Sequence, residues 1–160
     1  MYLIFLIKIK FHHFLIVFVL FSSCLKKSNN INFINIENDT WLASDTLFFN
    51  FKDLDTEKKY YAQLTVKHKT DYYYQNLILF LQANNQIDTL NLQLAKKNGT
   101  WNSKGAGDIR FYSKTLKNLN FDKKDSICIV INHAMRNTNT NQIREIHGVS
   151  SVGLEIINKD

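Results

Sequence analysis

Apolar and polar residues alternate along much of the chain from Thr46 onward. Residues 60–67 place apolar side chains at every second position, and residues 88–94 repeat this pattern with leucines at three alternate positions. Successive side chains of a β-strand point to opposite faces, so a period of two is typical of a half-buried strand. The pattern therefore predicts strands rather than helices over most of the chain.

Four further segments predict strands: Thr46–Phe51, Gln75–Ala83, Ser126–Ile131 and Val149–Ile157. Gln75–Ala83 is almost continuously apolar, which is typical of a strand covered on both faces. Ser126–Ile131 is also an apolar run and predicts a buried strand, in which Cys128 is a core residue rather than a nucleophile. A single helical turn is expected within Ser113–Asn120.

Turn-forming residues separate these strands, in the clusters Asn84-Asn85, Lys97-Asn98-Gly99 and Gly105-Ala106-Gly107-Asp108. Several short strands at fairly regular spacing, without a sustained apolar helix face, favour an all-β fold. We expect an antiparallel β-sandwich, jelly-roll-like in its arrangement.

The first residues differ from the rest of the chain. Residues 1–21 contain Lys8 and Lys10 but no acid, and an apolar run ends at Phe21, before Ser22, Ser23 and Cys24. A basic segment, a short apolar stretch and small residues are typical of a secretory signal peptide, here residues 1–23. Leu20-Phe21-Ser22-Ser23-Cys24 resembles the bacterial lipobox, which predicts lipidation of Cys24 with palmitate or similar chains. Ordinary secretion and an uncleaved anchor are the alternatives.

This signal divides the chain into three parts: the signal peptide, an Asn-rich lipid-anchored tether at residues 24–40, and a β-sandwich domain at residues 41–160. Loss of residues 1–23 would lower the net charge from +6 to +4. The remaining lysines are scattered rather than clustered, and a secreted protein does not meet nucleic acid. We therefore expect a membrane partner, through the lipid, and no nucleic-acid partner.

The sequence offers no catalytic constellation. His68, His133 and His147 are isolated, whereas a zinc site needs several His or Cys at close spacing. Gly148 to Gly153 lacks the spacing of a nucleophile elbow. We expect no enzyme, no metal and no cofactor.

Two features indicate candidate interaction sites. The row Tyr72, Tyr73 and Tyr74, together with Trp101, would stack on sugar rings or contact a protein if exposed in one plane. The alternative is that alternate tyrosines enter the core while their hydroxyl groups reach water. Arg136 is one of few arginines in a Lys-rich chain, so we expect it in an ion pair with Asp71 or Glu145.

The order of motifs provides a further indication. After the lipobox come Trp41, Asp71–Leu77, Asp88–Leu90, Leu94-Ala95, Gly99–Trp101, Gly105–Asp108, Met135-Arg136 and Ile146–Leu154. This ordered set resembles the gliding motility lipoprotein family GldH of Bacteroidota. The chain departs from the family's Tyr-Pro-Tyr loop at Tyr73. It also has Gly148-Val149-Ser150-Ser151-Val152-Gly153 where the family has Gly-Ile-Xaa-Xaa-Val-Gly.

The resemblance implies a non-enzymatic cell-envelope lipoprotein that supports gliding motility and the associated type IX secretion through contacts with other gliding and secretion proteins. The segment Leu25-Lys26-Lys27-Ser28 lacks the acidic cluster associated with surface export in these bacteria, which favours the periplasmic face of the outer membrane. A glycan-binding sandwich lipoprotein with an aromatic platform is the alternative function.

Overall fold

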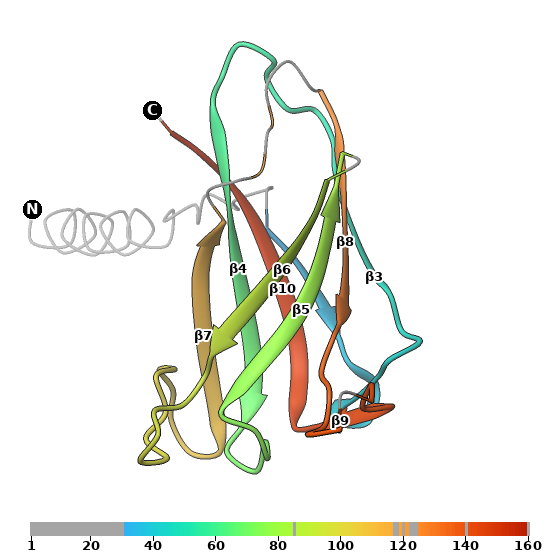
Figure 1. Cartoon of the computed structure of the whole chain (residues 1–160). Coiled ribbons are helices and arrows are strands. Elements are labelled where there is room, and N and C mark those ends of the chain that lie inside the picture. Colours follow the sequence, from blue (N-terminus) through green and yellow to red (C-terminus); the bar gives the residue numbers. More distant parts are fainter. Residues whose placement is uncertain are drawn as a thin grey trace, which may run out of the picture.

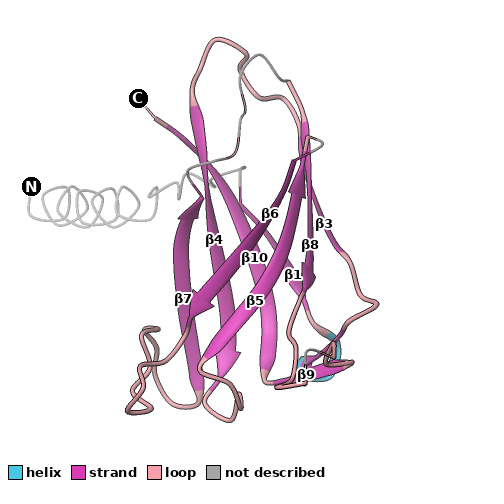
Figure 2. Ribbon diagram, viewed as in Figure 1, coloured by secondary structure: helices cyan, strands magenta, loops and turns pink. Residues whose placement is uncertain are grey.

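The computed structural model describes residues 31–84, 86–116, 119, 121, 125–139 and 141–159. These residues form β1 (Ile31–Asn35), η1 (Glu37–Asp39), β2 (Thr40–Leu42), β3 (Leu47–Phe51), β4 (Tyr60–Lys69), β5 (Asn76–Ala83), β6 (Gln86–Gln93), β7 (Ile109–Leu116), β8 (Ile127–His133), β9 (Glu145–His147) and β10 (Val149–Asn158). The strands dominate the structure, as Figure 2 shows, and η1 is a short 3-10 helix.

Two four-stranded sheets make up the sandwich (Figure 1). The first sheet has the order β1-β10-β4-β7 and the second sheet has the order β3-β8-β5-β6. A two-stranded sheet, β2-β9, lies at one end. Every pairing between these strands is antiparallel. The all-β class and the antiparallel sandwich expected from the sequence are confirmed.

The period of two seen in the sequence builds the core. Along β4, buried and partly exposed residues alternate without interruption, and Leu64 is 1% exposed. Leu154 from β10, Leu79 from β5 and Ile129 from β8 are fully buried in the same core. Each such side chain contributes about 1.5–3 kcal/mol by leaving water, so the apolar alternation is the main driving force for the sandwich.

The connections gather at two opposite ends. Residues 36–46, 70–75, 94–108, 134–139 and 141–148 lie at one end, here called the loop end (Figure 1). At the other end lie the connection between β3 and β4 and the last residues of β10. β1 begins toward that end, because Ile31 pairs with Glu155 of β10. Most motifs that carry the family resemblance therefore come together at the loop end, although they are far apart in the sequence.

The domain begins earlier than the sequence indicates. The range 24–40, expected to be a tether, contains β1 and η1, and β1 pairs with β10 from Ile31 to Asn35. A helical turn was expected within Ser113–Asn120, but residues 113–116 of that range belong to β7.

Two burial predictions are also wrong, for one shared reason. Cys128 lies on a strand as expected, but it is exposed rather than part of the core. β5 is buried on one face, and Phe80 on its other face is 40% exposed. Apolar residues point outward from both strands, and this hides the alternation in the sequence.

The outward residues of the second sheet form a surface with no charged side chain, here called the neutral face. It comprises Phe48, Asn50, Asn76, Ile78, Phe80, Gln82, Ile87, Thr89, Asn91, Gln93, Cys128, Val130 and Asn132. The outward side of the first sheet, in contrast, carries Lys67, Lys69 and Glu155. The two sides of the sandwich therefore present different chemistry to their surroundings.

Candidate functional site

The three consecutive tyrosines at the loop end face different environments. Tyr72 is 3% exposed and its hydroxyl donates a hydrogen bond to the Asn76 carbonyl over 2.9 Å. Burial raises the pKa of Tyr72, so its phenol stays protonated. Tyr73 is 89% exposed, and Tyr74 is partly buried against the core.

These rings do not form a flat platform. The ring of Tyr74 stands edge-on to that of Tyr72, with 65° between their planes, and edge-on to that of Tyr73, with 85° between them. A sugar ring stacks on an exposed aromatic face, which Tyr72 lacks because it is buried. Of the two readings of this row, the geometry favours the one in which alternate tyrosines pack inward.

Trp101 packs on a buried histidine. The rings of Trp101 and His68 lie 4.7 Å apart between centroids, and Tyr72 lies 5.9 Å from the same histidine. His68 Nε2 lies 2.8 Å from Ser103 Oγ, and His68 Nδ1 lies 2.9 Å from the Lys69 carbonyl oxygen. The sequence offers no signal for this cluster, because 35 residues separate the histidine from the serine.

A serine bonded to a histidine raises the question of nucleophilic chemistry. His68 is fully buried, and this burial lowers its pKa, so the ring is neutral. Two cavities lined by described residues, one between β6 and β7 and one beside residues 35–37 and 44–48, do not include this pair. The hydrogen bonds instead attach the loop at Ser103 to the end of β4.

Gly148 joins the same end of β4 to the corner between β9 and β10. Its φ of +88° lies in the left-handed region, and an added Cβ would stand 2.9 Å from the Tyr72 Cα. The Gly148 N–H donates to the Asp39 carbonyl, and the Gly148 carbonyl accepts from the Lys69 N–H, both over 2.8 Å. Only glycine fits this close approach without strain.

An ion pair between Lys69 and Asp39 lies beside this corner. The Lys69 ammonium is 2.5 Å from the Asp39 carboxylate, which lowers the pKa of Asp39, while the same contact raises the pKa of Lys69. The pair connects η1 to β4. Together with Gly148, it links three segments that the sequence separates widely.

A second histidine, His133, is also buried, which the sequence does not predict. His133 is 1% exposed and stands edge-on to Trp41, 5.7 Å away between ring centroids. Neither of its ring nitrogens has a hydrogen-bond partner among the described residues. Burial lowers the pKa of His133 despite the nearby Asp45 carboxylate, so this ring is neutral as well.

Arg136 lies in the connection between β8 and β9. Its side chain is exposed, and its backbone pairs with Gln142. The structure thus brings Tyr72, Tyr74 and Trp101 into one cluster around His68, while Tyr73 points outward and Arg136 belongs to a separate connection.

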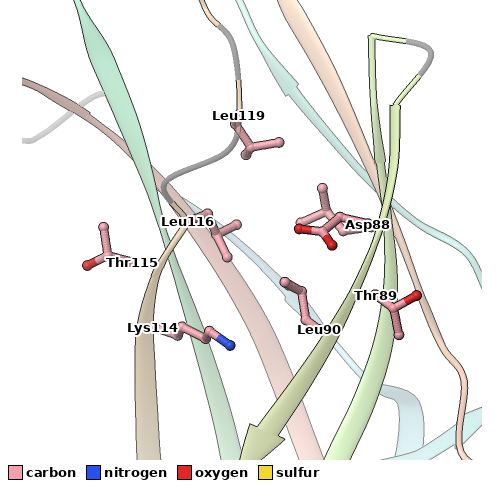
Figure 3. Close-up of a pocket in the computed structure, with 8 residues that line it drawn as sticks. Asp88, Thr89, Leu90, Lys114, Thr115, Leu116 and Leu119 are labelled. Atoms are coloured by element: carbon pink, nitrogen blue, oxygen red, sulfur yellow. The ribbon is translucent and has the colours of Figure 1, made fainter.

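A cleft of about 430 Å³ opens between β6 and β7 (Figure 3). Leu81, Leu90, Leu116 and Leu119 give it an apolar floor, and Asp88 and Lys114 lie on opposite walls. The side chain of Thr89 points away from the cleft, as expected for its position between two inward residues of a strand. Sequence reasoning missed this cleft because β7 was not predicted.

The other predicted features have these outcomes. Cys24 and the signal peptide at residues 1–23 lie outside the described residues. Within the described ranges, no group of three or more His, Cys, Asp or Glu could hold a metal ion. No helix in that part of the chain is long and apolar enough to cross a membrane.

The fold and the loop-end cluster define the class of protein: an all-β sandwich whose widely spaced motifs meet at one end. The family model described as GldH lipoprotein matches residues 30–156, and the chain belongs to this family. The family that the ordered motifs suggested is thereby confirmed.

Two relatives carry the corresponding name. The "gliding motility lipoprotein GldH homolog" of Christiangramia forsetii is 31% identical over 92% of this chain and 94% of its own length. The "gliding motility lipoprotein GldH" of Flavobacterium johnsoniae is 26% identical over 91% of this chain and 94% of its own length. The chain is thus similar over nearly its full length to proteins named for gliding motility.

Among solved structures, the CBM35 module of Cellvibrio japonicus Abf62 matches with a TM-score of 0.38 and 11% identity. The match covers 81% of this chain and 78% of that module. A likeness of this size carries no argument about function.

Proposed function

We propose that this protein is an outer-membrane lipoprotein, attached through a lipid on Cys24, that supports gliding motility and the associated type IX secretion. It acts through contacts with other envelope proteins and catalyses no reaction. The observation that carries the proposal is the family match over residues 30–156, together with relatives named gliding motility lipoproteins.

The position of the proposed anchor gives the sandwich an orientation. Cys24 precedes the first residue of β1 by seven positions, and seven residues span at most about 25 Å. The end of the sandwich where β1 begins therefore stays close to the membrane. β10 runs along the sandwich for ten residues, which is about 33 Å, so the loop end is held away from the bilayer.

The absence of an acidic cluster after Cys24 supports attachment to the periplasmic face, where partners in the envelope would meet the loop end and the sides of the sandwich. A role without catalysis is supported by the full burial of His68, whose ring packs against Trp101 and is hydrogen-bonded to Ser103. A protein of this kind acts by binding, and its surfaces carry its function.

Deletion of the gene in a gliding host tests the proposal. We expect cell spreading and secretion of type IX substrates to be lost and to return with the wild-type gene. Labelling with a palmitate analogue is expected to mark the wild-type protein but not Cys24→Ala. Normal spreading and secretion in the deletion strain would contradict the proposed role, whereas equal labelling of both proteins would contradict the anchor alone.

A further inference from the structure

The four edge strands of the sandwich are not equally protected. β1 and β3 have five residues each, and the Asn32 side chain of β1 donates a hydrogen bond to the Asn50 carbonyl of β3 over 3.2 Å. The free edge of β7 is partly covered, because Phe111 and Lys104 exchange two backbone hydrogen bonds. Short strands and covered edges are common ways to prevent a further strand from pairing.

β6 lacks most of these protections. It has eight residues, contains no Lys, Arg or Pro, and pairs with β5 in a continuous register without a bulge. Among the described strands, β5 alone pairs with it. Near the end of β6, Asn102 donates to the Gln93 carbonyl over 2.9 Å, which marks where the open part of the edge stops. Asp88 is the single charge on the strand.

Both flanks of this edge suit an added strand. On the inner side, the cleft offers the leucine floor with Asp88 on its wall (Figure 3). On the outer side lies the neutral face, where Ile87 of β6 is 71% exposed. A strand placed beside β6 would direct alternate side chains into the cleft and over the neutral face.

We propose that the edge of β6 binds an extended segment of another envelope protein as an additional strand of the second sheet. In this mode main-chain hydrogen bonds provide affinity, and pockets for alternate side chains provide specificity. The segment is uncharged on its outward residues, because the neutral face offers no opposite charge. Inward it carries apolar residues for the leucine floor and one basic residue that faces Asp88 on the β6 wall of the cleft, away from Lys114 on the β7 wall. The proposal rests on the proposed function only in that the protein acts by binding.

A second copy of this chain fits the edge less well than a different protein. Antiparallel pairing of β6 with β6 would point the two sandwiches in opposite directions, so their β1 ends would lie at opposite ends of the pair. Both chains are anchored only seven residues before β1 in the proposed arrangement. One membrane could then not hold both copies upright. A second copy also repeats Asp88 and offers no basic residue on β6.

In-cell photocrosslinking of the full-length protein tests this proposal. A benzoylphenylalanine is placed at Ile87, Thr89 or Asn91, all outward on β6, and at Ser113 on the outward side of the first sheet as the control. Crosslinked sites on the partner are mapped by mass spectrometry. The experiment is repeated with Asp88→Lys and Asp88→Asn, and cell spreading is measured in the same strains.

We expect the three β6 positions to crosslink to one segment of one protein, with the partner site moving by about two residues per position. That order is a strand register, which docking on a face would not give. Asp88→Lys reduces the crosslink at least tenfold, and Asp88→Asn retains most of it. Crosslinks to a second copy, partner sites without order, or yields equal to those at Ser113 would overturn the proposal. The two proposals can fail independently. Ordered crosslinks would support binding at β6 even if the deletion strain still spreads, and that spreading would contradict only the role in motility.

Discussion

The two outward sides of the sandwich contain similar aromatic and aliphatic residues, yet they differ in how these residues are used. On the first sheet, the Phe33 ring lies over Gly153, where an added Cβ would come within 2.3 Å of the ring. Thr65 and Ser113 are hydrogen-bonded across strands on the same side over 3.0 Å. Phe33 is itself 49% exposed, and on the second sheet Phe48 is 57% exposed and Ile87 is 71% exposed.

This difference shows that an exposed apolar residue can either stabilise the fold or be available for binding. Phe33 contributes to the fold, because it covers a glycine of the neighbouring strand. The neutral face carries no charge, and its Phe48 lies opposite Val130 of the neighbouring strand rather than opposite a glycine. An uncharged surface that exposes Phe48, Phe80 and Ile87 is a candidate interaction site. The comparison predicts that mutations on the outward side of the first sheet lower the stability of the fold, whereas mutations on the neutral face weaken binding to a partner.

The largest stability effect is expected at Gly153. Gly153→Val would place its side chain where the Phe33 ring lies, so the ring would have to leave its position against β10. Overpacking of this kind costs about 1–3 kcal/mol. Chemical denaturation of the purified protein measures the loss, with Thr89→Val on the neutral face as the control, for which we expect a change of at most about 0.5 kcal/mol. Equal losses would remove the contrast between the two sides.

Truncation of one phenylalanine on each side gives a smaller and more direct contrast. Phe33→Ala uncovers Gly153, so we expect a loss of about 1–2 kcal/mol, in the range typical of single mutations. Phe48→Ala removes a side chain that is mostly in water already, so its expected loss is about 0.5 kcal/mol or less. If Phe48→Ala proved the more destabilising variant, Phe48 would belong to the core.

The stability of the protein is also expected to depend on pH, through the ion pair between Asp39 and Lys69 of the first sheet. Lys69 lowers the pKa of Asp39 in the folded protein below its unfolded value near 3.9. This contribution to stability is therefore present at neutral pH and is lost as the pH falls below about 4. Asp39→Asn is expected to lower the melting temperature slightly at pH 7 and to lower it less at pH 3, because the contribution is lost as the pH falls through the lowered pKa of Asp39. A constant difference at both pH values would contradict the ion pair.

The two buried histidines provide a pH effect that is shared by both sheets. Burial lowers the pKa values of His68 and His133 below their unfolded value near 6.5, so the unfolded state binds more protons under mildly acidic conditions. Stability is thus fully present above pH 6.5 and falls as the pH decreases below it. We expect His133→Phe to reduce this fall between pH 7 and 5 in thermal unfolding. An unchanged pH profile would show that His133 does not contribute.

The sequence predicted the fold where one face of a strand is apolar and the other polar, as in β4. It failed where the outward residues are apolar as well, as with Phe80 and Cys128, since such strands look doubly buried. β7 was missed for the opposite reason. Its inward side includes Arg110, which donates to the Gly107 carbonyl, and Lys114, which lines the cleft. Both charges interrupt the apolar pattern.

The loop-end cluster could be predicted only in part. Tyr72 and Trp101 were recognised as unusual residues, but their contacts pass through His68 and depend on how β4, β5 and β7 are arranged. The short strands β2 and β9 have three residues each, too few to show a period. They are held instead by the packing of Trp41 and Ile146 into the core.

The most direct test of the central claim places a lysine on each side of the sandwich in a gliding host that lacks its own copy of the gene. Ile87→Lys lies on the neutral face beside the open edge, and Ser113→Lys is its counterpart on the first sheet. Protein level and melting temperature are measured for both, and colony spreading is the readout. We predict that Ile87→Lys abolishes spreading at normal protein level and melting temperature, while Ser113→Lys spreads like wild type. Equal spreading of the two strains would contradict a binding role for the second sheet.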